Sequence, residues 1–160
     1  GEIIMGYTHY WYIADEISRD SWYKFIGDFH KILPNFESTL DTQGDQKLQT
    51  VNGMVYLNGI GELSHETFCL ERVTDITGFT QRDDDNGLIF KFCKTAQKPY
   101  DIAVCSALII AKRYFGESIM ISSDGDNAEW KESKALCQKI LGYGDDLNMN
   151  YSTPVGEFSQ

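Results

Sequence analysis

The sequence predicts a single α+β domain in which about five strands, in a mixed or antiparallel sheet, pack with three helices. Segments with the two-residue repeat of a strand and the three- to four-residue repeat of a helix follow in the order strand, helix, three strands, helix, strand, helix. No repeat, linker or change of composition divides the 160 residues, so one domain is expected over residues 5–144. Residues 1–4 are interpreted as an N-terminal extension and residues 145–160 as a mobile tail.

The first strand and helix are predicted from residues 6–33. Residues 6–13 are rich in Tyr, Thr and Trp, which favour strands. Aromatic residues alternate onto both faces of this strand, so at least one face needs a partner. A helix follows, with Asp15 or Ser18 as its N-cap and one apolar stripe at positions 22, 25, 26, 29, 32 and 33. Pro34 lies near its end, and residues 35–50 are interpreted as a loop.

Three strands are predicted next, at residues 54–57, 67–73 and 88–95. Asn86-Gly87 is a strong turn signal between the last two, which are therefore expected to form an antiparallel pair. Pro99 opens a second helix that Gly116 ends, and its apolar residues on all sides predict burial. Residues 118–121 are apolar on both faces and are expected to lie inside the sheet. The last helix, residues 127–141, has a capping box at Asp126 and Glu129.

Composition excludes several classes of function. The net charge of -10, from 24 acidic and 14 basic residues, argues against direct binding of nucleic acid or anionic lipid. No apolar run is long enough for a membrane span, and no signal peptide is visible at the first residues, so a cytoplasmic location is expected. The four cysteines form no CxxC pair and are expected to be free thiols. No metal-ligand spacing or cofactor motif is present, so neither a metal nor a cofactor is expected.

Five segments of the chain carry a family resemblance. They are Gly6-Tyr-Thr-His-Tyr-Trp11, His65-Glu-Thr-Phe68, residues 92–95 with 98–101, Ser123-Asp-Gly125 before Trp130, and residues 136–138 before 141–144. Over residues 5–144 the chain resembles a family of small bacterial and phage proteins that open with Met-Gly-Tyr-Thr-His-Tyr-Trp. The resemblance implies a cytosolic protein, in the host cytoplasm if it is encoded by a phage, and it carries over no catalytic residue. By analogy alone, small phage proteins of this kind include counter-defence proteins that sequester nucleotide immune signals.

Two histidines are candidate site residues. His9 lies in the middle of the first strand, and His65 with Glu66 lies at a loop boundary, where ligand groups often occur. If the two imidazoles meet, Glu66 would orient one of them and raise its basicity, and Asp101 is a further candidate acid. The plain alternative is that His9 is a hydrogen-bonded core residue and that residues 65 and 66 form an ordinary turn.

The segment from Lys91 to Asp101 is the most informative one. Three of the 14 basic residues fall within eight positions before a helix, so Lys94, Thr95 and Lys98 form a candidate anion site. The alternative is a capped loop with solvated lysines. Asp124 follows a strand, where sites also occur, although a helix cap explains it equally well. The complete set of candidate ligand-binding residues is Tyr7, His9, Trp11, His65, Glu66, Lys94, Thr95, Lys98, Tyr100 and Asp124.

Three functions are compatible with these residues. The favoured one is non-catalytic binding of a small nucleotide-derived ligand, with aromatic rings on the base and Lys94, Thr95 and Lys98 on phosphate. A symmetric homodimer would close such a pocket. The alternatives are a hydrolase or phosphodiesterase that uses His9, His65 and Glu66, and an acidic protein-binding module or nucleic-acid mimic. The absence of any complete catalytic signature favours the binder.

Overall fold

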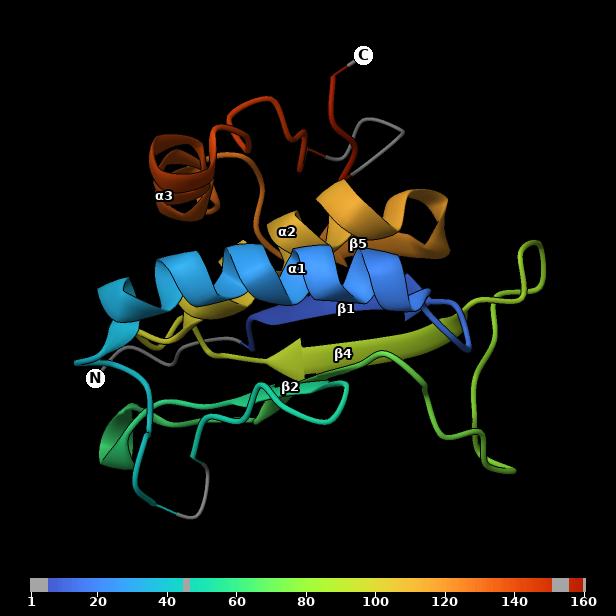
Figure 1. The fold of residues 1–160 in the computed structure, drawn as a ribbon, viewed down its shortest axis with the longest axis horizontal. Coiled ribbons are helices and arrows are strands. Elements are labelled where there is room, and N and C mark those ends of the chain that lie inside the picture. Colours follow the sequence, from blue (N-terminus) through green and yellow to red (C-terminus); the bar gives the residue numbers. More distant parts are fainter. Residues whose placement is uncertain (1–5, 45–46, 151–155, 160) are drawn as a thin grey trace.

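The computed structural model describes residues 6–44, 47–150 and 156–159. The expected extension at residues 1–4 and part of the expected tail lie outside these described residues. The α+β class is confirmed, with five antiparallel strands and three α-helices in one domain over these described residues. The strands are divided between two sheets, and the helices and the second sheet lie on opposite sides of β4 in the view of Figure 1.

The larger sheet has three strands in the order β4-β1-β5. β1 (Thr8–Ile13) is central, and both β4 (Ile89–Lys94) and β5 (Ile119–Ser123) run antiparallel to it. The expectation that residues 118–121 are internal to the sheet is therefore wrong, since β5 is an edge strand. Its apolar pattern has a different origin: Ile119 and Ile121 face the core, whereas Met120 is 44% exposed on the opposite face.

The smaller sheet pairs β2 (Met54–Leu57) with β3 (Phe68–Glu71). The predicted pairing of residues 67–73 with 88–95 is wrong, because β3 pairs with β2 and β4 pairs with β1. The Asn86-Gly87 turn joins only a short ladder, in which residues 81–83 meet residues 88–90. Tertiary packing overrides the local turn signal here, since Phe68 and Leu70 must face the same core as Val55 and Leu57.

The helices follow the predicted pattern closely. α1 (Arg19–Ile32) begins after Ser18, whose Oγ accepts the Ser21 N–H at 3.2 Å. The other candidate cap, Asp15, instead forms an ion pair with Arg82 at 2.6 Å. α2 (Asp101–Phe115) is buried over most of its length and ends at Gly116, as expected, but it begins two residues after Pro99, which lies in the preceding turn. α3 (Lys131–Leu141) begins later than predicted, because residues 127–130 form turns in which Glu129 accepts the Asp126 N–H.

The helices cover one face of the three-stranded sheet. His9, Trp11 and Ile13 on that face are fully buried, and α2 contacts both α1 and α3 above them (Figure 1). Leu147 and Met149 after α3 are also buried, although the sequence pattern there predicted only a tail. All four cysteines are free, and none of the helices in the described ranges is long and apolar enough to span a membrane.

Candidate functional site

His9 is the centre of a buried polar cluster between β1, β5 and α2. Its side chain is fully buried, with Nδ1 2.8 Å from Ser123 Oγ and Nε2 2.6 Å from Asp101 Oδ1. Thr95 Oγ1 donates to the same Asp101 oxygen at 2.5 Å. The rings of Tyr7 and Trp130 pack edge-on against the imidazole, with centroids 5.1 and 5.3 Å away. The expectation of a hydrogen-bonded core histidine therefore describes this residue.

The hydrogen bonds of Ser123 fix the tautomer of His9. Ser123 Oγ accepts the Gly125 N–H at 2.9 Å and the Trp130 Nε1–H at 3.1 Å, which occupies both of its lone pairs. Its hydroxyl proton is therefore donated to His9 Nδ1. The imidazole then carries its proton on Nε2 and donates it to the Asp101 carboxylate. In this assignment His9 is a structural group that joins Ser123 at the end of β5 to Asp101 at the start of α2.

Three possible metal ligands lie together in this cluster. His9, Asp101 and Cys105 each offer a ligand atom, all within 4.8 Å of one another. Asp101 and Cys105 are four residues apart on one helix, so their side chains share a face. This spacing could have been noticed in the sequence, but it was not used there. The surroundings do not suit a cation. Burial, with Asp101 beside it, holds the pKa of Cys105 well above its usual value, so the thiolate ligand is unfavourable. A metal on Nε2 would also require Nδ1–H to donate to Ser123, whose lone pairs are filled.

The remaining expected aromatic residues are core groups. Trp11 and Tyr100 are fully buried, and the Tyr100 hydroxyl donates to the Glu66 carbonyl. The Tyr7 hydroxyl is buried with no regular hydrogen bond among the described residues, although Ser123 lies close enough to moderate its pKa. Burial, and secondarily the nearby Cys105 and Asp101, raise the pKa of Tyr7 well above its ordinary value. These rings therefore belong to the packed core.

His65 and Glu66 make none of the hydrogen bonds that hold the His9 imidazole. His65 is exposed, and its backbone is held by the side chain of Asn58. Glu66 Oε1 accepts the Lys94 N–H at 2.9 Å, so this carboxylate caps the end of β4. Asp101, not Glu66, is the carboxylate that orients His9. The geometry therefore does not assemble the His9, His65 and Glu66 arrangement that the hydrolase hypothesis requires.

The predicted anion segment is split between surface and core. Lys94 is exposed, whereas Thr95 is fully buried against Asp101. Lys98 Nζ lies 3.4 Å from the Glu62 carbonyl. Asp124 is exposed and accepts the Thr8 N–H at 3.0 Å and the Tyr10 hydroxyl at 3.1 Å, so it closes the end of the sheet. None of these residues lines any of the five cavities identified in the described part of the chain.

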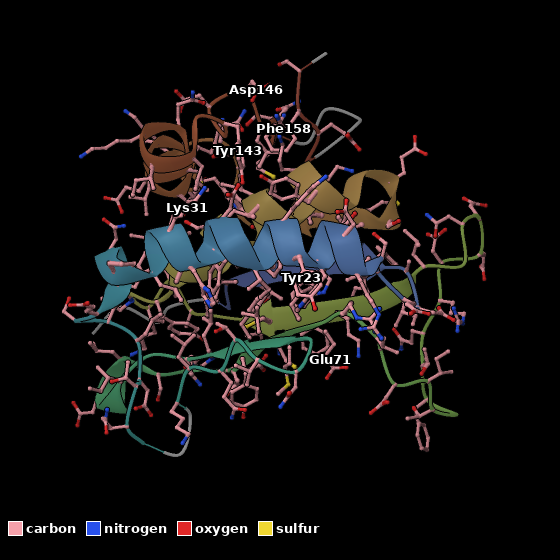
Figure 2. All side chains as sticks on the ribbon, viewed as in Figure 1. Tyr23, Lys31, Glu71, Tyr143, Asp146 and Phe158 are labelled. Atoms are coloured by element: carbon pink, nitrogen blue, oxygen red, sulfur yellow. The ribbon has the colours of Figure 1, made fainter. Side chains whose placement is uncertain are left out.

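A different cleft combines cations and rings. It has a volume of about 500 Å³ and lies between α1 and the turn at residues 50–53. α1 contributes Arg19, Trp22, Tyr23 and Ile26, and Arg72 lies just after β3. In Figure 2, Tyr23 lies on the side of α1 nearer the second sheet. This cleft was not predicted from the sequence, although Arg19 and Tyr23 are four residues apart and so share a helix face.

The two arginines of this cleft differ in their contacts. Arg72 is 17% exposed, and its Nη1 lies 3.1 Å from both Glu16 Oε1 and the Ile17 carbonyl, so it is held in place. Arg19 is exposed, and no hydrogen bond or ion pair of its guanidinium occurs within the described ranges. Tyr23 is 71% exposed beside it. One fixed cation, one free cation and one open ring therefore line the same cleft.

Comparison of the chain with protein-family models, with curated proteins and with solved structures finds no match. The family resemblance of the sequence analysis stays an expectation, and the site has to be interpreted from its own geometry.

Proposed function

We propose that this protein binds a small, planar, anionic molecule of the nucleotide-derived class in the cleft between α1 and residues 50–53, without chemically changing it. The observation that carries the proposal is the combination of Arg19 and Arg72 with the exposed ring of Tyr23 in one cleft of about 500 Å³. This volume is typical of small-molecule sites, which range from about 300 to 1,000 Å³.

The chemistry of the cleft supports an anion with a flat ring. A guanidinium presents a planar fork of donors that matches phosphate oxygens, and Arg72 is already oriented by Glu16 and the Ile17 carbonyl. Tyr23 offers an open face for stacking on a base. In a chain with a net charge of -10, two arginines on one cleft are a local exception that would attract such a ligand.

The proposed ligand belongs to the class expected from the sequence, but the proposed site is the cleft between α1 and residues 50–53, not the segment around Lys94. Besides His9, four of the ligand-binding residues expected from the sequence are buried, and burial favours a structural role for them: Tyr7, Trp11, Thr95 and Tyr100. The resemblance to bacterial and phage proteins makes nucleotide immune signals the first ligands to test. Sequestration of such a signal by a phage counter-defence protein is the finer form of the proposal.

A thermal-shift screen with nucleotides and cyclic nucleotides tests the binder. A ligand that occupies the cleft should raise the melting temperature, and mass spectrometry should recover it intact. Arg19→Ala and Tyr23→Ala should each weaken its affinity about tenfold, which corresponds to about 1.4 kcal/mol. Lys139→Ala on α3 is the matched loss of one positive charge and should leave the affinity unchanged.

Two results would contradict the proposal. A broad nucleotide panel that leaves the melting temperature unchanged would argue against binding, and equal affinity in the Arg19→Ala protein would exclude this cleft. Product formation in the same samples, lost in a folded His65→Ala protein, would favour the hydrolase instead. Salt-sensitive capture of a DNA-binding protein would favour the acidic module.

A further inference from the structure

The face of the three-stranded sheet that lies opposite the helices carries an apolar surface. The strand registers place Tyr10 and Tyr12 of β1 beside Phe92 and Phe90 of β4, and Met120 of β5 beside Tyr12. Their rings touch: Phe90 lies 5.3 Å from Tyr12 and 5.9 Å from Phe92, measured between centroids. We call this set of five residues the open face.

Two large apolar side chains of the open face are exposed, one on each side of β1. Phe92 is 50% exposed and Met120 is 44% exposed, while the other three side chains are half-buried by one another. The helices cannot cover them, because α2 packs on the opposite face through His9. Contiguous exposed apolar residues of this kind mark interaction surfaces.

Two opposite charges border the open face at one end. Lys94 is paired with Thr8, so it continues the row of Phe90 and Phe92 on β4. Asp124 follows β5, and its contacts with Thr8 and Tyr10 place it at the same level on the other side of β1. Both residues are exposed. The positive and negative groups therefore lie on opposite sides of the central strand, at equal height along it.

We propose that the open face packs against the open face of a second copy of this chain, about a two-fold axis parallel to β1. Rotation about this axis leaves the position of each residue along the strand direction unchanged. It exchanges the positions of the two edge strands, β4 and β5. β4 of one copy then lies over β5 of the other. Lys94 of each copy then faces Asp124 of the other, Phe90 faces Met120, and Phe92 faces Ser122, which is paired with Tyr10. Each cation therefore meets a carboxylate, and Phe90 meets an apolar side chain.

Charge complementarity selects this occupant and this axis. An axis perpendicular to the strands would place Lys94 over Phe90 and bury an ammonium without an opposite charge, which is strongly unfavourable. Nucleic acid and anionic membranes fit poorly, because the chain has a net charge of -10 and Asp124 borders the face. A two-fold dimer is the commonest assembly of identical chains, and packed sheets lie about 10 Å apart with strands offset by about 30°. The cleft of the proposed function is not part of this surface, so the two proposals fail independently.

Sedimentation and light scattering over a concentration series test the dimer. The wild-type protein should reach twice the chain mass of 18.2 kDa. Phe92→Glu and Lys94→Glu should each shift it to the monomer, with an unchanged circular dichroism spectrum. Ile60→Glu changes an apolar residue of equal exposure outside the face, and Lys139→Glu makes the same charge reversal on α3, so both controls should remain dimeric.

Thiol cross-linking tests the axis. In a Cys69→Ser background, which removes the one half-buried thiol, Tyr12→Cys should be cross-linked efficiently by a reagent that spans about 10 Å, since residues of the central strand face their own copies. Met120→Cys, which should face Phe90 instead, should be cross-linked at least fivefold less. A wild-type protein that stays monomeric at every concentration overturns the proposal. A dimer that survives both Phe92→Glu and Lys94→Glu, or that cross-links better through Met120→Cys, overturns it as well.

Discussion

Tyr7 and Gly125 illustrate how tightly the buried cluster is packed around His9. A Cβ added at Gly125 would overlap the Tyr7 hydroxyl and would also come within 2.9 Å of the Glu129 Cβ. That hydroxyl has no regular hydrogen bond among the described residues, so its removal should change the free energy of unfolding little. Glycine is therefore required at position 125, because the side chain of Tyr7 occupies the space that a Cβ would need.

Gly125→Ala should therefore lower the free energy of unfolding by about 1–3 kcal/mol, the usual effect of overpacking. Tyr7→Phe alone should change it by less than about 1 kcal/mol. The double variant should recover part of the loss, because the clash with the oxygen is gone while the contact with Glu129 remains. Urea unfolding measures all three. Strictly additive losses would show that the hydroxyl and the glycine do not meet.

Asp28 is a second buried carboxylate, and it joins the three helices. Its Oδ2 accepts hydrogen bonds from Tyr114 at 2.6 Å and from Tyr143 at 2.7 Å, and Lys31 lies 3.3 Å from Oδ1. Burial raises the pKa of Asp28, but these hydrogen bonds outweigh it and leave the pKa below its ordinary value. In Figure 2, Tyr143 lies beside α3 on the side of the helices away from the second sheet.

The lowered pKa of Asp28 predicts a pH dependence of stability. A carboxyl whose pKa is lower in the folded state stabilises the protein fully above the unfolded value of about 3.9. This contribution falls as the pH drops from there through the folded value. Asp28→Asn should therefore flatten the loss of stability below about pH 4. Thermal melts at several pH values measure it, with Asp20→Asn at an exposed surface pair as the control. Equal acid sensitivity in the two variants would contradict the role of Asp28.

The connection between β2 and β3 depends on one asparagine. Asn58 is buried, and all four of its hydrogen-bonding positions are used: Nδ2 donates to the His65 carbonyl and to Thr67 Oγ1, while Oδ1 accepts the Gly59 and His65 N–H groups. The side chain thus closes the loop that joins the two strands of the second sheet and sets the position of His65.

Asn58→Asp keeps the size of this side chain and replaces two donors with an acceptor. The new carboxylate oxygen would face the His65 carbonyl, so the free energy of unfolding should fall by about 2 kcal/mol or more. Asn35→Asp, at an asparagine that makes one bond to the Ile32 carbonyl near the surface, should lose less. Chemical denaturation compares the two. A loss at position 58 no larger than at position 35 would show that the loop is held by other contacts.

At the scale of the whole molecule, Lys112 joins distant parts of the chain. This lysine of α2 is buried, and its Nζ donates to the Gly116 carbonyl at 3.1 Å and to the Ile119 carbonyl at 3.0 Å. It also forms an ion pair with Glu157 at 3.0 Å. Asn148 and Glu157 are bridged through their backbones, so the chain after α3 is tied to the start of β5.

Glu157→Gln should therefore destabilise the protein although residue 157 lies near the end of the chain. The buried ammonium would lose its opposite charge, and the expected loss is about 1 kcal/mol because Glu157 is partly exposed. Hydrogen exchange at residues 147–149 should rise at the same time. Glu132→Gln, an exposed position on α3, is the matched control and should change neither quantity. An unchanged exchange rate in the Glu157→Gln protein would show that the ion pair does not anchor this segment.

The sequence by itself determined the elements and their inner faces. The alternation of β1, the apolar stripe of α1 and the end of α2 at Gly116 could all be predicted, because they follow from periodicity and backbone chemistry within a few neighbouring residues. The alternation of aromatic residues in β1 also predicted that at least one of its faces would need a partner, and the aromatic face opposite the helices is the one that stays partly exposed.

Only the tertiary structure decided the partners. The strong turn at Asn86-Gly87 did not reveal that β3 pairs with β2, and the cationic segment at Lys94 did not reveal that Thr95 turns inward to Asp101. The cleft with Arg19 and Arg72 joins residues 53 positions apart, as Asp101 joins His9 across 92. Such contacts form because the apolar faces of distant segments pack into one core. The free energy of that packing depends on all of these segments together, so no single segment predicts it.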